Sequence, residues 1–133
     1  MIIENKEKAL ELLQEMLDAG EEAILPLNML SWHCGTACCL CGDVAIARNY
    51  HEDDDDELSV KALAFSDELD DELGCDLAES IYGSVSSVRL ESVRELEFLT
   101  SEELEHKHLT IGHCDRTIAH DYIKLIMKKI KEL

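Results

Sequence analysis

Proline and long apolar runs are scarce in this chain of 133 residues. It contains one proline, and no apolar run approaches the roughly 20 residues that a helix needs to cross a bilayer. The opening residues, MIIENKEKAL, also lack the uninterrupted apolar core of a signal peptide. We therefore expect a cytoplasmic protein without a membrane segment. Because 46% of the residues are apolar and proline is nearly absent, we also expect a helix-rich fold.

Basic residues are few as well. The chain has 12 Lys and Arg against 30 Asp and Glu, which gives a formal net charge of −18. This charge disfavours direct binding of nucleic acid or anionic lipid and favours a basic protein partner. The motifs G-x-x-x-x-G-K-[ST], G-x-G-x-x-G and G-x-S-x-G are absent, so nucleotide binding and hydrolase chemistry have no support. We predict a protein that is not an enzyme, with no catalytic residue and no cofactor.

Apolar residues recur every three or four positions along most of the chain, which predicts an all-α single domain, residues 1–133, of about five to seven helices. We expect Gly20 and Gly74 to end two of these helices, and Asp76 to cap another. The segment 51–57, HEDDDDE, is interpreted as a solvated loop, because six adjacent like charges cannot bury surface. The expected helices cover residues 4–19, 37–49, 58–73, 76–82, 84–99, a short segment from Thr100, and 115–133.

Four of the six cysteines lie in one segment, NMLSWHCGTACCLCG, residues 28–42, together with the only tryptophan. Cytoplasmic cysteines are mostly thiols, so this cluster is more naturally buried, metal-binding or redox-sensitive than a set of disulfides. We interpret the cysteines first as small buried apolar residues that pack beside Trp32, at the start of a central helix capped by Thr36. The alternative is redox chemistry at Cys38 or Cys39. The expected core residues here are Met29, Trp32, Cys39, Leu40 and Val44.

The same segment, written N-M-x-x-W-H-C-G-T-x-x-C-x-x-G, resembles a motif of small, mostly uncharacterised proteins of bacteriophages and bacteria. A weaker likeness extends to residues 73–83, LGCDLAESIYG. The resemblance implies a small helical fold of phage or bacterial origin and supplies no catalytic residue. This chain departs from the family at Cys38 and Cys41, where alanine-like residues are usual. The positions that carry the motif are Asn28, Met29, Trp32, Cys34, Gly35, Thr36, Cys39 and Gly42.

Zinc binding is the alternative function. The dipeptides His33-Cys34 and His113-Cys114 each lie just before an expected helix, and folding could bring these four side chains into one tetrahedral site. Their spacing is not that of a zinc ribbon or finger. The acidic run also lacks the glycine and the ligand spacing of a calcium-binding EF-hand. If the four side chains do converge, the chain is a zinc-binding structural or regulatory module.

The densest charge lies between Glu52 and Glu79, where thirteen acidic residues accompany one lysine. A carboxylate-rich face can imitate the phosphates of DNA and compete for a basic groove. We therefore predict that the chain binds and inhibits a basic host or phage protein, such as a nucleic-acid-handling factor of host defence or transcription. A homodimer stays open, as does a purely solvating role for the charge. The predicted partner-binding residues are Glu52, Asp53, Asp54, Asp55, Asp56, Glu57, Asp67, Glu68, Asp70, Asp71, Glu72 and Asp76.

Overall fold

The computed structural model describes residues 3–23, 40–49, 51, 54–82 and 116–133. These residues form helices and contain no strand, which confirms the all-α class for this part of the chain. The predicted number of helices stays a prediction, because the expected helices at 84–99 and from Thr100 lie outside the described residues. The helices are α1 (Lys6–Glu21), α2 (Leu40–Arg48), α3 (Asp55–Leu73), α4 (Cys75–Tyr82) and α7 (Arg116–Lys131).

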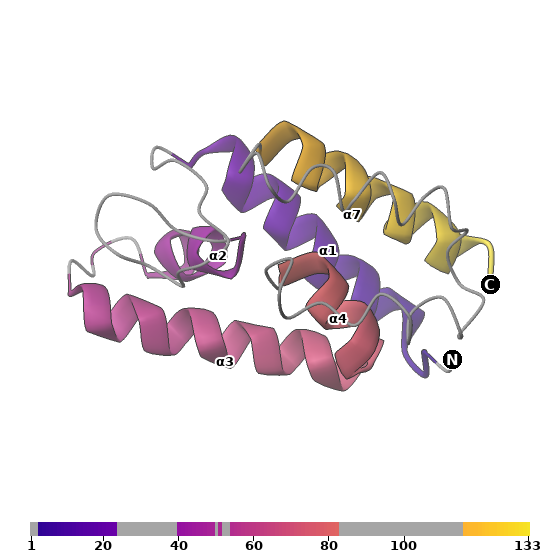
Figure 1. The fold of residues 1–133 in the computed structure, drawn as a ribbon, viewed down its shortest axis with the longest axis horizontal. Coiled ribbons are helices and arrows are strands. Elements are labelled where there is room, and N and C mark those ends of the chain that lie inside the picture. Colours follow the sequence, from indigo (N-terminus) through magenta and orange to yellow (C-terminus); the bar gives the residue numbers. More distant parts are fainter. Residues whose placement is uncertain (1–2, 24–39, 50, 52–53, 83–115) are drawn as a thin grey trace.

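Helix α1 is the central element of the described fold, since it contacts α2, α3 and α7 (Figure 1). Helix α7 runs beside α1 in the opposite direction, and α3 lies on the other side of the molecule. Helix α2 packs against both α1 and α3, while α4 folds back onto α3 and also touches α7. None of the described helices combines the length and the apolar character needed to cross a membrane.

Helix α1 begins and ends two residues later than the range 4–19 that its sequence predicts. Asn5 caps it, with its side-chain oxygen accepting a hydrogen bond from the Lys8 backbone N–H at 3.0 Å. The prediction that Gly20 ends the helix is wrong, because α1 continues through a buried Gly20 to Glu21. The ring of His120 on α7 lies where a β-carbon of residue 20 would stand, so any larger residue at this position would displace the ring.

Helix α3 begins inside the acidic segment. Asp54 is its N-cap and accepts hydrogen bonds from the backbone N–H groups of Asp56, at 2.9 Å, and Glu57, at 3.1 Å. The interpretation of 51–57 as a loop is therefore wrong from residue 55 onward. The physical reason is that a helix N-terminus carries partial positive charge, so acidic residues stabilise the first turn instead of preventing it.

Gly74 ends α3 and leads directly into α4. Its φ of +86° lies in the region that favours glycine, and its N–H donates to the Asp70 carbonyl at 2.9 Å. The predicted glycine end of this helix is thus confirmed. The carbonyl of Gly74 accepts a hydrogen bond from the Ala78 N–H at 3.0 Å, so α4 begins at Cys75 and Asp76 lies within its first turn. The prediction of Asp76 as a helix cap is wrong, because the residue before the helix is Gly74, two positions earlier.

The described core draws side chains from all of these helices. The predicted core residues Leu40 and Val44 are fully buried, which confirms them, whereas Met29, Trp32 and Cys39 lie outside the described residues. Burial of one such large apolar side chain contributes about 1.5–3 kcal/mol to folding, so this core dominates the stability. Its largest members are Leu12, Leu13, Met16, Leu40, Phe65, Leu69, Leu73, Leu77, Ile81 and Tyr122.

Candidate functional site

The solvent-facing side of α3 carries an unusual mixture of charge and apolar surface. Five exposed side chains recur every three or four residues on the side of the helix opposite its buried face. We name this set the outer stripe. It consists of Asp56, Val60, Leu63, Asp67 and Asp71.

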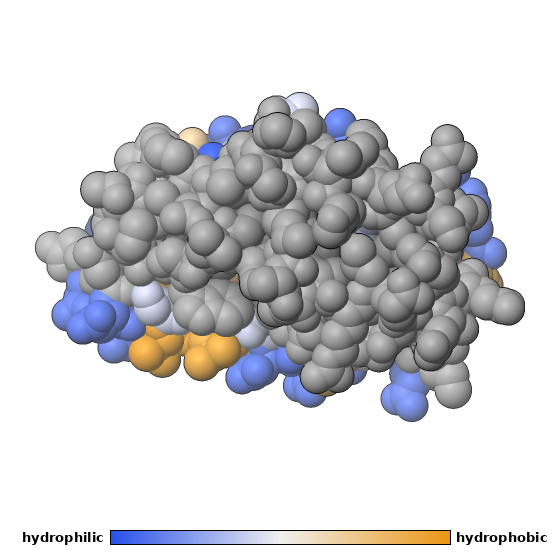
Figure 2. All heavy atoms as spheres, in the orientation of Figure 1, coloured by the Kyte–Doolittle hydropathy of each residue, from blue (hydrophilic) through white to orange (hydrophobic). Residues whose placement is uncertain are grey.

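Two apolar residues lie at the centre of the outer stripe. Val60 is 62% exposed and Leu63 is 47% exposed, and both stand out among the large apolar residues that the structure describes. Figure 2 shows an apolar patch flanked on both sides by hydrophilic residues along the edge where Figure 1 places α3. Single exposed apolar side chains are common on protein surfaces, so the distinguishing feature of this pair is its position between carboxylates. We therefore treat the pair and the carboxylates around it as one candidate contact surface.

One predicted partner-binding residue, Glu68, also takes part in holding the fold together. Arg48 of α2 donates to both oxygens of Glu15 on α1, at 2.6 and 2.8 Å, and to Glu68 on α3, at 2.7 Å. Its guanidinium also lies 5.0 Å from the centre of the Phe65 ring. The hydrogen bonds that Arg48 donates to Glu15 and then to Glu68 raise the pKa of Arg48 above its ordinary value, while burial opposes them. Glu68 therefore joins α3 to α2 and is a structural residue.

Other members of the predicted set also have local roles or lie off the outer stripe. Asp54 caps α3, and Glu57 lies 3.9 Å from Lys61 one turn away. Asp70 and Glu72 are half-buried. The predicted residues Glu52 and Asp53, and the side chains of Asp55 and Asp76, lie outside what the structure describes.

Three predicted partner-binding residues remain on the outer stripe: Asp56, Asp67 and Asp71. Each is exposed, and no ion pair in the described part of the chain involves any of them. Asp67 and Asp71 are four residues apart, so their carboxylates stand one helical turn from each other. Together with Val60 and Leu63, these carboxylates form the candidate site.

The cysteine-rich motif lies almost entirely outside the described residues. Gly42 is buried in α2 beside the buried Cys41, whereas Asn28, Met29, Trp32, Gly35, Thr36 and Cys39 are not described. The predicted zinc ligands His33, Cys34, His113 and Cys114 also lie outside the described part. Within that part, no group of three His, Cys, Asp or Glu side chains is placed to hold a metal ion. Zinc binding by the four predicted ligands stays a prediction.

One buried ion pair was not foreseen from the sequence. Arg116 at the start of α7 donates from Nε and Nη2 to the two carboxylate oxygens of Asp43 on α2, both at 2.9 Å. The Asp43 side chain is fully buried, and that of Arg116 is 19% exposed. A signal existed, since Asp43 is the one acidic residue of the mostly apolar helix α2 and buried acids are usually paired. Its partner could not be named, because 73 residues separate the two.

Comparisons with known proteins found no matching family model, no matching curated protein and no matching solved structure. The likeness of the cysteine-rich segment to small phage and bacterial proteins therefore stays a prediction. The candidate site has to be interpreted from its own chemistry.

Proposed function

We propose that this chain is a non-enzymatic interaction protein that binds a basic protein through the outer stripe of α3. The observation that supports the proposal is the exposure of Asp56, Asp67 and Asp71 around Val60 and Leu63. Carboxylates alone would give a soluble helix. The two apolar side chains add the kind of surface that a partner buries when it docks.

The two components of the outer stripe make different contributions to binding. An exposed ion pair is worth about 0.2–1 kcal/mol, so the aspartates mainly accelerate association and make it salt-dependent. Covering the exposed parts of Val60 and Leu63 contributes about 1 kcal/mol each, and this share does not depend on salt. We therefore expect the affinity to fall as the salt concentration rises, and then to level off at the value that the apolar contacts supply.

The proposed partner is a nucleic-acid-handling protein of the host cell, such as a defence or transcription factor, which the chain inhibits. Such a protein exposes a basic groove for DNA, and an acidic helix with a net molecular charge of −18 competes with DNA for that groove. The chain acts by occupying the groove and catalyses no reaction.

The test uses three immobilised proteins: the unchanged chain, a stripe variant and a charge-matched control. The stripe variant carries Asp56→Asn, Asp67→Asn and Asp71→Asn, which leaves the cap residue Asp54 and the Arg48 partner Glu68 intact. The control carries Glu4→Gln, Glu7→Gln and Glu11→Gln, three exposed residues in and just before α1. Host lysate is applied at low and moderate salt, and captured proteins are identified by mass spectrometry.

The proposal expects a basic protein that is retained by the unchanged chain and the control but weakened about tenfold or more in the stripe variant, since each lost ion pair is worth a factor of about two to five. Duplex DNA should displace it. Equal capture by all three proteins, or capture that DNA does not reduce, would contradict the proposed mechanism.

A further inference from the structure

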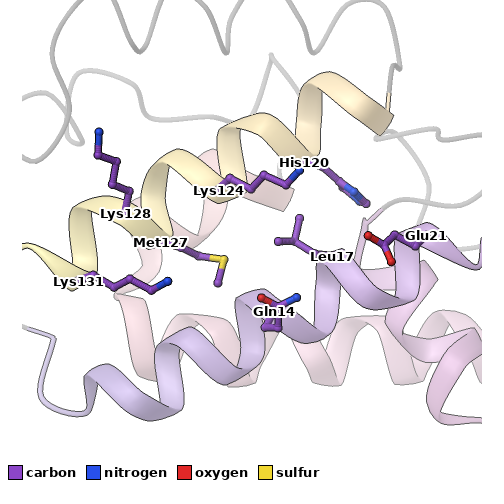
Figure 3. Close-up of a pocket in the computed structure, with 8 residues that line it drawn as sticks. All are labelled: Gln14, Leu17, Glu21, His120, Lys124, Met127, Lys128 and Lys131. Atoms are coloured by element: carbon purple, nitrogen blue, oxygen red, sulfur yellow. The ribbon is translucent and has the colours of Figure 1, made fainter.

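A second candidate site lies on the opposite side of α1, in the groove between α1 and α7. Its cavity has a volume of about 370 Å³ (Figure 3). Small-molecule sites in proteins typically measure about 300–1,000 Å³, so the groove is large enough for a ligand. Because it uses neither α3 nor the outer stripe, it is independent of the function proposed above.

The floor of the groove is apolar and its edge is basic. Leu17 of α1 and Met127 of α7 line the floor, and each is less than a tenth exposed. Lys124 and Lys131 lie on α7 about one turn before and one turn after Met127, so their ammonium groups flank the thioether along the same stripe of the helix (Figure 3).

This basic edge is unusual in so acidic a chain. Helix α7 carries five of the 12 basic residues of the sequence. Lysines in the last turn of a helix are explained by the partial negative charge of its C-terminus. Lys124 lies about two turns before the end of α7, where that effect has faded, so the helix dipole does not account for its position.

His120 lines one end of the groove, beside Glu21 (Figure 3). Its Nε2 atom is buried and has no hydrogen-bond partner among the described residues. This atom packs against Gly20, so it faces α1 and not the open groove. Burial lowers the pKa of this imidazole, an effect that Asp43 and Glu21 oppose and that Arg116 and Lys124 reinforce.

We propose that the groove binds an amphiphilic carboxylate, whose apolar body lies on Leu17 and Met127 and whose charge is held at the basic edge by Lys124 and Lys131. A volume of about 370 Å³ is sufficient for the chain of a medium-length aliphatic acid. The class of ligand follows from the pairing of an apolar floor with a cationic edge.

Decanoate is the probe for this proposal. It is titrated into the full chain while calorimetry records the affinity and NMR follows the Met127 methyl group and the His120 ring. Decanol supplies the same body without charge, and acetate supplies the charge without the body. We expect decanoate to bind with both signals shifted, decanol to bind about tenfold more weakly because two ion pairs are each worth a factor of about two to five, and acetate not to bind measurably.

Two double variants test the lysines. Lys124→Gln with Lys131→Gln should weaken decanoate about tenfold, whereas Lys6→Gln with Lys8→Gln, which removes the same charge outside the groove, should leave its affinity unchanged. Helical content by circular dichroism checks that both variants are folded. Bound decanoate should also raise the pKa of His120, because a nearby anion stabilises the imidazolium.

Three results would overturn the proposal. Decanoate could fail to bind, decanol could bind as tightly as decanoate, or the two double variants could lose affinity equally. None of these results bears on the outer stripe of α3, so failure here leaves the proposed interaction function to its own test.

Discussion

The ion pair between Asp43 and Arg116 gives a quantitative prediction about how α7 is held to α2. Replacement of Arg116 by Met keeps the aliphatic stem but removes both donors, which lie 2.9 Å from the Asp43 oxygens. The carboxylate then stays buried without the guanidinium. Loss of one member of a buried pair costs about 3–5 kcal/mol, and loss of an exposed pair about 0–1 kcal/mol.

The partial exposure of Arg116 decides where the loss of unfolding free energy falls between the values for buried and exposed pairs. Its side chain is 19% exposed while that of Asp43 is fully buried, so water screens part of the interaction. We expect Arg116→Met to lower the free energy of unfolding by about 3 kcal/mol. Because 1 kcal/mol shifts the midpoint of thermal unfolding by about 3–5 °C in a chain of this size, the midpoint should fall by about 10 °C.

Urea unfolding followed by far-ultraviolet circular dichroism measures this change. Asp43→Asn and the double variant Asp43→Asn with Arg116→Met complete a double-mutant cycle, with an expected coupling energy of about 2 kcal/mol. Lys124→Met, at an exposed position on the same helix, is the control and should change stability by less than about 0.5 kcal/mol. A cost below about 1 kcal/mol for Arg116→Met would refute the view that this pair joins the two helices.

Two further predictions concern the contact between Gly20 and His120. Gly20→Ala should destabilise the chain, because a β-carbon would meet the His120 ring. When His120→Ala is also present, the same change should stabilise the chain by about 0.5–1 kcal/mol, since alanine favours helix. Thermal unfolding measures both effects, and a Gly20→Ala effect of the same sign in both backgrounds would contradict the contact. Burial lowers the pKa of His120 below 6.5, so the unfolded chain binds more protons between the lowered value and 6.5, and stability should fall as pH drops through that interval. His120→Gln should remove this part of the pH dependence, and an unchanged slope would show that His120 does not contribute.

The helical faces of the described chain were predictable from residue spacing alone. Leu58, Ala62, Phe65 and Leu69 recur every three or four positions, and all are buried on one side of α3. Gly74 was also predictable, because a glycine after the last periodic residue commonly ends a helix with positive φ. These features depend on neighbours within one or two turns, which a single sequence displays.

The helix boundaries were less predictable, because they depend on caps and on packing. The acidic segment suggested a loop, yet Asp54 caps α3 and the charges that follow it suit a helix N-terminus. Gly20 suggested a helix end, yet its missing side chain serves the contact with His120. Acidic residues are common both in loops and at helix N-termini, and glycine is common both at helix ends and at close contacts. Only the surrounding structure shows which of the two applies.

The sequence by itself determined the helical class of the described segments and the strongly acidic character of the chain. Both follow from composition and from local periodicity, which do not depend on how helices are arranged. The tertiary structure decided which charges are used within the fold. Asp67 and Glu68 are adjacent in sequence, but Arg48 reaches only Glu68, and Asp67 faces solvent on the outer stripe. The pairing of Asp43 with Arg116 and the groove between α1 and α7 likewise exist only because distant segments pack side by side.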